Sequence, residues 1–270
     1  MKLRQVARSR AGRILFALFG WLLFAPGLQM AQADDFRVAS KVVAGQDDTR
    51  KNEALSIFHD GQVYNFMTSP HEITIYNLPQ SKIELLDPAR QVRAEITIDQ
   101  LATFVEKLRV LAARQTDPLL RFAAEPKFQA TSGDKGWRTF ESQLITYRVR
   151  TTMADDQKIA HAYREFADIS ARLNALVNPG SMPPMPRLAV NAALDQDGQI
   201  PEEVEVTLRL AKDPAEKPTI LHSNHLFKTG LAPSDSKLLD DAKQGLSSYK
   251  EIALDEYLKP QKPETKPEKK

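Results

Sequence analysis

The stretch Ser56-Ile-Phe-His-Asp-Gly-Gln-Val-Tyr-Asn-Phe66 decides the fold class of this chain. Its Asp60-Gly61 pair has the chemistry of a two-residue hairpin turn, and Val63–Phe66 is the strand that returns from it. Outward from this hairpin, apolar and polar residues alternate between turn residues from Asp34 to Thr97. Period-two alternation is the pattern of half-buried antiparallel strands. Residues 34–97 are therefore predicted to form a meander with one apolar face.

At Thr97 the apolar residues change to helical spacing. Thr97 and Gln100 have the residue types of a capping box, which satisfies two N–H groups at the start of a helix. This helix is predicted to end near Gln115, and a second is predicted from Asp155 to Val177, before Asn178-Pro179-Gly180. Together with the strands, the two long amphipathic helices predict an α+β fold, in which a curved antiparallel β-sheet is covered on one face by helices.

The remaining segments are assigned by the same two periods. Further strands are expected at 137–142, 145–150, 188–194, 203–210 and 219–227, and short helices at 235–242 and 246–258. Met182-Pro-Pro-Met-Pro186 is expected to be an extended connector, because proline fixes φ and removes a ladder donor. Asp195-Gln-Asp-Gly198 is expected to be a hairpin turn. The Lys/Pro/Glu tail, residues 259–270, has nothing to bury and is expected to be disordered.

The first 33 residues have the three parts of an export signal. A basic start precedes the apolar run Ile14–Phe24, and Pro26-Gly27 and the small-x-small site Ala31-Gln32-Ala33 follow. An uncleaved membrane anchor is the alternative, but it needs roughly 20 apolar residues, and this run is shorter. We therefore expect a signal peptide, residues 1–33, that is cleaved after Ala33. The product is expected to be soluble and to reside in the periplasm or outside the cell.

Removal of the leader changes the charge of the chain. The full sequence of 270 residues has a net charge of +2, and the leader holds five basic and no acidic residues, so the remaining chain is at −3. Nucleic-acid binding thus loses its compositional support. The absence of cysteine excludes disulfides, thiol catalysis and lipid attachment at a cysteine. Residues 34–258 are expected to form a single β-rich α+β domain, with a sub-boundary at 178–187 as the alternative.

Candidate catalytic and metal-binding chemistry is sparse. Only His222-Ser-Asn-His225 brings two of the five histidines close together in the sequence. In the strand expected there, the two imidazoles point to opposite faces, and no third ligand is identifiable. Asp195–Gly198 lacks the acidic positions of a calcium loop. The sequence has no nucleophile elbow, no phosphate-binding glycine loop and no H-E-x-x-H. We therefore expect no enzyme, no metal and no cofactor.

The hairpin Ser56–Phe66, followed by Glu72-Ile-Thr-Ile-Tyr76 and Lys82-Ile-Glu-Leu-Leu-Asp87, resembles the half-barrel fold of LolA/LolB-like envelope lipoprotein carriers. The likeness covers the order of elements from Asp34 to Phe227. It implies that a curved sheet and a helical lid enclose an apolar cavity for acyl chains, without covalent catalysis. By this resemblance, eight residues face the cavity, namely Ile73, Ile75, Val92, Ile96, Tyr147, Val149, Val204 and Val206.

Two functions of different classes remain open. The first is non-catalytic binding or transport of a lipid or lipoprotein acyl chain in the cell envelope. The second is a structural or protein-interaction module of the envelope with no small-molecule ligand. The tail, with five lysines and two glutamates, has a net charge of +3. This is weaker than the basic clusters that bind acidic lipids well, and it suggests no more than peripheral contact with the envelope. The sequence leaves the oligomeric state open.

Overall fold

A twelve-stranded sheet organises the computed structural model, which describes residues 35–44, 50–209 and 218–259. All of these residues belong to one compact unit. The expected signal peptide, its cleavage site after Ala33 and residues 260–270 of the expected tail lie outside the described residues. Within the three described ranges, no helix has the length and apolar character needed to span a membrane.

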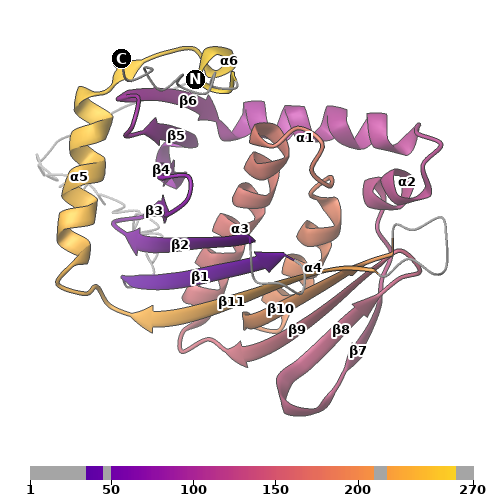
Figure 1. The fold of residues 1–270 in the computed structure, drawn as a ribbon. Helices are drawn as coiled ribbons and strands as arrows, with labels where there is room; N and C mark the ends of the chain where they lie inside the picture. The colour runs from indigo at the N-terminus through magenta and orange to yellow at the C-terminus, as the bar shows by residue number, and fades with distance from the viewer. Residues whose placement is uncertain (1–34, 45–49, 210–217, 260–270) are drawn as a thin grey trace, which may run out of the picture. The chain divides into compact units, whose positions relative to one another are not determined.

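The strands follow the order β12-β6-β5-β4-β3-β2-β1-β11-β10-β9-β8-β7 across the sheet (Figure 1). Every pair is antiparallel except β12 with β6, which is parallel. The strands are β1 (Phe36–Ala44), β2 (Arg50–His59), β3 (Gln62–Met67), β4 (Glu72–Asn77), β5 (Lys82–Asp87), β6 (Val92–Thr97), β7 (Gln129–Ser132), β8 (Trp137–Glu141), β9 (Ile145–Met153), β10 (Gln199–Leu208), β11 (Thr219–Thr229) and β12 (Lys250–Glu251).

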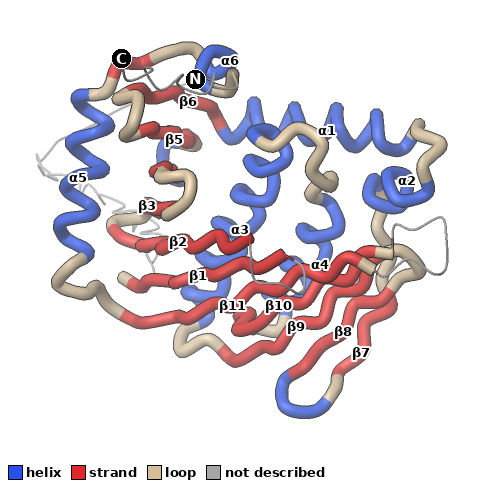
Figure 2. The backbone as a smooth tube through the Cα atoms, in the orientation of Figure 1, coloured by secondary structure: helices blue, strands red, loops and turns tan. Residues whose placement is uncertain are grey.

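Helices lie on both faces of this sheet (Figures 1 and 2). We call the face against α1, α3 and α4 the inner face, and the face against α5 the outer face. The helices are α1 (Ile98–Ala113), α2 (Pro118–Ala124), α3 (Gln157–Val177), α4 (Met185–Gln196), α5 (Asp235–Ser248) and α6 (Leu254–Tyr257), with 3-10 turns at Leu78–Gln80 and Asp134–Gly136. The expected α+β class, with a large antiparallel sheet covered by long helices, is confirmed.

Local sequence signals account for the two long helices. At the start of α1, the side chain of Thr97 accepts from the N–H of Gln100, and the side chain of Gln100 accepts from the N–H of Thr97. The predicted capping box is therefore confirmed. Helix α3 buries a stripe that includes Ile159, Tyr163 and Phe166, as its helical period predicts.

Aromatic rings fill the space between the inner face and α3. Phe36 stacks on Phe58 with their ring centroids 3.9 Å apart. Phe166 of α3 meets Phe58 and Tyr76 edge to face, at 5.4 and 5.2 Å. Aromatic pairs of this kind stabilise a core by more than the burial of their apolar surface alone. This part of the inner face is therefore a packed core.

The outer face carries a second core beneath α5, which corrects the expectation of one apolar face. Ile57, Tyr64 and Ile75 of the meander pack there against Leu239 and Ala242 of the helix. In β4 and β5 the four central residues of each strand are buried, so these strands are covered on both faces. The alternation of the sequence did not indicate this, because a helix far along the chain supplies the outer cover.

The segment expected to be a strand at 188–194 is helix α4, and the last two residues of the expected extended connector, Met185 and Pro186, already belong to this helix. Pro184 is its N-cap residue and Pro186 lies in its first turn, where a missing N–H costs nothing. Pro186, Val190 and Leu194 are buried at intervals of four residues, which is helical spacing. Asp195–Gly198 consequently joins a helix to β10 and is no hairpin turn.

The C-terminal region differs from expectation as well. Residues 235–248 form the single helix α5, where a break after Ala242 was expected, and the chain then adds the short strand β12 and the one-turn helix α6. Gly245 permits the continuous helix to approach the sheet, since a Cβ there would lie 3.0 Å from Cδ2 of Leu86. Helix α2 and strand β7 were not expected from the sequence.

Candidate ligand groove

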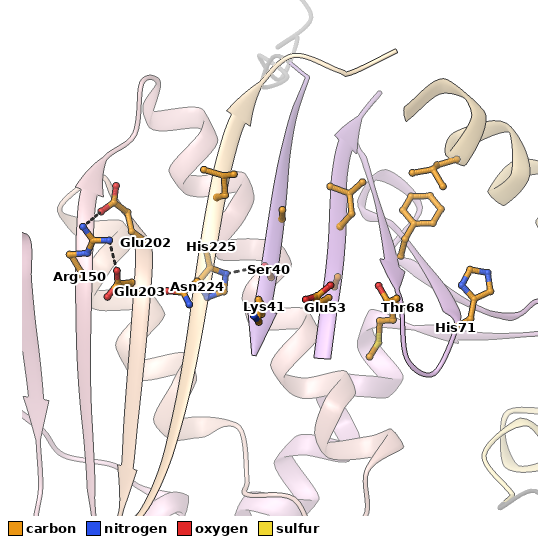
Figure 3. Close-up of a pocket in the computed structure, with 17 residues that line it drawn as sticks. Ser40, Lys41, Glu53, Thr68, His71, Arg150, Glu202, Glu203, Asn224 and His225 are labelled. Carbon is orange, nitrogen blue, oxygen red and sulfur yellow. Dashed lines mark hydrogen bonds and ion pairs between the residues drawn. The ribbon is translucent and has the colours of Figure 1, made fainter. Parts of the chain in front are cut away.

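A groove of about 810 Å³ crosses the outer face of the sheet beside α5 (Figure 3). Its lining comes from strands β3, β2, β1, β11, β10 and β9 and from the turn between β3 and β4, and Leu238 of α5 contributes to one side. Five strand-to-strand steps of about 4.8 Å place its ends about 24 Å apart. The side chains labelled in Figure 3 extend across these strands from His71 to Arg150. We call this feature the outer groove.

The floor of the outer groove is a row of apolar residues that are direct partners across neighbouring strands. Phe66 pairs with Leu55, and Leu55 with Ala39. Ala39 pairs in turn with Leu226. Direct partners point to the same face of a sheet, so their side chains form one apolar strip. The exposed fraction rises along it from 8% at Phe66 to 57% at Leu226.

This apolar row continues beneath α5. Phe66 also pairs with Ile73, and Ile73 with Leu86, both of which belong to the buried cluster under the helix. Helix α5 therefore covers one half of a continuous apolar row and leaves the other half open. The open half is the floor of the outer groove.

A polar row runs beside the apolar row on the same face. Its members, paired in order across β2, β1, β11, β10 and β9, are Glu53, Lys41, Asn224, Glu203 and Arg150. The guanidinium of Arg150 forms ion pairs with Glu203 and, at 3.4 Å, with Glu202, while its Nε is buried without a hydrogen-bond partner in the described residues. The outer groove therefore combines an apolar floor with a charged side.

The sheet opens at the end of the apolar row. Pairing between β10 and β11 stops at Glu203 and Asn224, although β11 remains paired with β1 as far as Thr229. A register shift between Pro201 and Glu203 bends β10 at the same point. We call this divergence the split. A second pocket of about 220 Å³ lies there, and it shares Glu202, His225 and Leu226 with the outer groove.

His225 joins the two pockets through a small polar cluster. Its Nδ1 lies 3.0 Å from Oγ of Ser40 and 3.3 Å from the hydroxyl of Tyr163, and its Nε2 lies 3.1 Å from Oγ of Ser223. Burial, and after it the positive charge of Arg187, lower the pKa of His225 to about 3. The imidazole is thus neutral and a poor base, and no carboxylate hydrogen-bonds to it in the described residues. A Ser40–His225 nucleophilic pair is therefore unfavourable.

The eight expected cavity residues are divided among three clusters. Ile73 and Ile75 face outward under α5. Val92 and Ile96 belong to the inner cluster that packs on α1 and α3. The remaining four, Tyr147, Val149, Val204 and Val206, lie together on the inner face in the cluster that includes α4. None of the eight lines the outer groove or the pocket at the split, and their contact with a ligand stays a prediction.

The histidine pair of β11 has the arrangement expected for a strand. His222 faces Glu205 at 4.0 Å on the exposed side, whereas His225 points to Tyr163 on the inner face. Within the described residues, no group of three or more His, Asp or Glu side chains is placed to hold a metal ion.

The groove residues were not predicted from the sequence because their pairing is long-range. Ala39, Leu55 and Phe66 were all placed on expected strands, and Leu226 lies in the strand expected at 219–227. Their assembly into one row depends on the pairing of β1 with β11, which joins residues 177 to 193 positions apart. The local signal for the groove was one apolar residue in each of these strands, and in the folded chain that residue lies on the outer face.

Comparison with known proteins gives likenesses at the level of structure alone. No family model matches the sequence, and no curated protein matches it. The chain is similar to the crystal structure of the LolA superfamily protein NE2245 from Nitrosomonas europaea, at 9% identity and a TM-score of 0.31. That alignment covers 75% of this chain and 89% of the other. The α+β architecture of this chain is an open antiparallel sheet with helical cover. It is established by the strand order and the packing of the chain itself.

Proposed function

We propose that this protein is a non-catalytic envelope protein that binds or carries an acyl chain of a lipid or lipoprotein in the outer groove. The observation that carries the proposal is the in-register apolar row, which runs out from beneath α5 to Leu226, with 57% of that residue exposed. A continuous exposed apolar strip on a soluble domain marks a contact surface.

The size of the outer groove supports this choice of ligand. Its volume of about 810 Å³ lies in the range of roughly 300–1,000 Å³ that small-molecule sites occupy. One acyl chain spans about half of the roughly 30 Å hydrocarbon layer of a bilayer, or about 15 Å. A groove about 24 Å long, from the spacing of its strands, accommodates that length.

The charges beside the floor fit an amphiphile rather than a purely apolar ligand. Arg150, Glu203 and Lys41 lie along one side, within reach of a polar group at the end of the chain. The lowered pKa of His225, about 3, makes this histidine a weak general base. Binding without chemistry is therefore the function that this site supports best.

A fluorescent fatty acid titrated into the purified protein tests the proposal. Leu226→Asp puts a charge into the apolar floor and is expected to weaken binding at least about tenfold, because burial of a leucine-sized apolar surface is replaced by the cost of desolvating a carboxylate. Leu111→Asp is the matched control, since Leu111 has the same exposed fraction of 57% but lies on α1.

The control is expected to bind the probe as the unchanged protein does. Failure of the unchanged protein to bind any fatty acid, with no acyl ligand in an organic extract, would contradict the proposal. That result would favour the alternative of a protein-interaction module without a small-molecule ligand. Equal weakening by both substitutions would place the acyl chain outside the outer groove.

A further inference from the structure

The pocket at the split differs in chemistry from the outer groove, although the two share Glu202, His225 and Leu226. Apolar side chains form the floor of the outer groove, whereas Asp155, Glu202, Lys228, Thr152 and Thr229 line the pocket at the split. Phe36 and Phe227 form its inner end. An amphiphile lying along the apolar row therefore meets a small polar pocket where the row ends at Leu226.

We propose that this pocket is a subsite for a zwitterionic lipid headgroup that bears both a phosphate and an amine. The inference rests on the proposed function, because it assumes that the acyl chain lies in the outer groove. It adds the class of the polar head and the end of the groove at which that head lies.

The charges at the pocket have both signs that such a headgroup requires. Asp155 accepts a long hydrogen bond of 3.4 Å from the hydroxyl of Thr229, and no cationic side chain lies within ion-pair distance of it in the described residues. Lys228 likewise has no carboxylate within ion-pair distance among those residues. Both side chains are exposed and solvated, and they are free to form charge-assisted hydrogen bonds, Asp155 with an ammonium and Lys228 with a phosphate.

The opening of the sheet explains why the pocket is available. If β10 and β11 stayed paired beyond Glu203 and Asn224, strand spacing of about 4.8 Å would close this space. Pro201 carries no N–H and cannot donate to such a ladder. The divergence therefore leaves a pocket of about 220 Å³ with the split on one side and Ile159 of α3 on the other.

Three amphiphiles with the same acyl chain test the subsite. Lysophosphatidylethanolamine, lysophosphatidylglycerol and the free fatty acid are each used below their micelle concentrations to displace the fluorescent probe. We expect lysophosphatidylethanolamine to bind at least about fivefold more tightly than lysophosphatidylglycerol, as one charge-assisted hydrogen bond allows. Asp155→Asn is expected to remove this preference and to leave the affinity for the fatty acid unchanged.

Glu53→Gln is the matched control. Glu53 lies in the polar row of the outer groove but does not line the pocket at the split, so its replacement is expected to preserve the headgroup preference. Equal affinities for the two lysophospholipids, tighter binding of the anionic one, or an unchanged preference in Asp155→Asn would overturn the subsite and leave acyl-chain binding intact. Failure of all three amphiphiles to bind would instead overturn the proposed function.

Discussion

Nη1 of Arg37 lies 3.3 Å from Oδ1 of Asp235, across 198 positions of sequence. Asp235 begins α5 and is fully buried, and its Oδ2 also accepts the backbone N–H of Ala232 at 2.6 Å. Arg37 points from β1 to the outer face. The pair therefore connects the start of α5 to strand β1.

Arg37→Ala is expected to lower the free energy of unfolding by about 3–5 kcal/mol, because it leaves a buried carboxylate without its countercharge. Urea denaturation measures this loss. Arg148→Ala is the control, since the Arg148–Glu205 pair lies at the surface and is worth at most about 1 kcal/mol. A double variant, Arg37→Ala with Asp235→Asn, is expected to be more stable than Arg37→Ala alone. Equal losses in the two arginine variants would contradict this role.

Stability is expected to fall on acidification through His225. Its pKa is about 3 in the folded protein, lowered by burial and by Arg187, against an ordinary value of 6.5. The unfolded chain therefore binds the proton first, so the contribution is fully present above about pH 6.5 and is lost as the pH falls toward 3. The slope approaches about 1.4 kcal/mol per pH unit.

Chemical denaturation of the protein and of His225→Asn between pH 7 and 5 measures that slope, which the variant should lack. His161→Asn is the control because the side chain of His161 is 68% exposed. A slope that is unchanged in His225→Asn would show that other groups cause the acid sensitivity.

Gly136→Ala is expected to destabilise the protein more than Gly230→Ala. Both glycines have a positive φ, +78° and +74°, which costs an alanine about 1–2 kcal/mol. Only at Gly136 would the new Cβ also meet backbone, 2.6 Å from the carbonyl oxygen of Thr151. Thermal unfolding of the two variants isolates the cost of this close approach, and equal melting temperatures would argue against it.

The helix pair α3 and α4 is expected to depend on a buried hydrogen bond. Nδ2 of Asn191 donates to Oδ1 of Asp168 at 2.8 Å, and Arg164 holds the other oxygen at 3.2 Å. Asn191→Ala leaves a buried carboxylate oxygen without its donor and is expected to cost about 1–3 kcal/mol. Asn174→Ala removes an exposed amide interaction and should be close to neutral in the same urea titration. A neutral Asn191→Ala would mean that water replaces the donor.

The sequence predicts those elements whose signals are local. Thr97 and Gln100 cap α1 with atoms three residues apart, and the hairpin at Asp60-Gly61 joins adjacent strands, so neither depends on the rest of the molecule. Helix α4, in place of the expected strand, has a non-local contact: its polar residue Asn191 is buried against Asp168 of another helix. The continuity of α5 through Gly245 depends likewise on contact with Leu86.

The candidate site could be predicted only in part for the same reason. Outward-facing apolar residues such as Leu55 and Leu226 are visible in the strand patterns, but their alignment requires the register of β1 with β11. The end of the row requires the divergence at Glu203 and Asn224, which no local signal specifies. The eight residues that the resemblance implied lie in three separate clusters, and their contact with a ligand stays a prediction.

The pairing of Phe36 with Thr229 also limits when this protein can finish folding. Strand β1 lies at the centre of the sheet, between β2 and β11. One of its two edges therefore has no partner until the chain as far as Thr229 has emerged from the ribosome. A nascent chain can form the N-terminal meander early, but it cannot join the two halves of the sheet before most of its translation is complete. Pairing of β1 with β11 is therefore a late step with a high contact order, and such steps fold slowly.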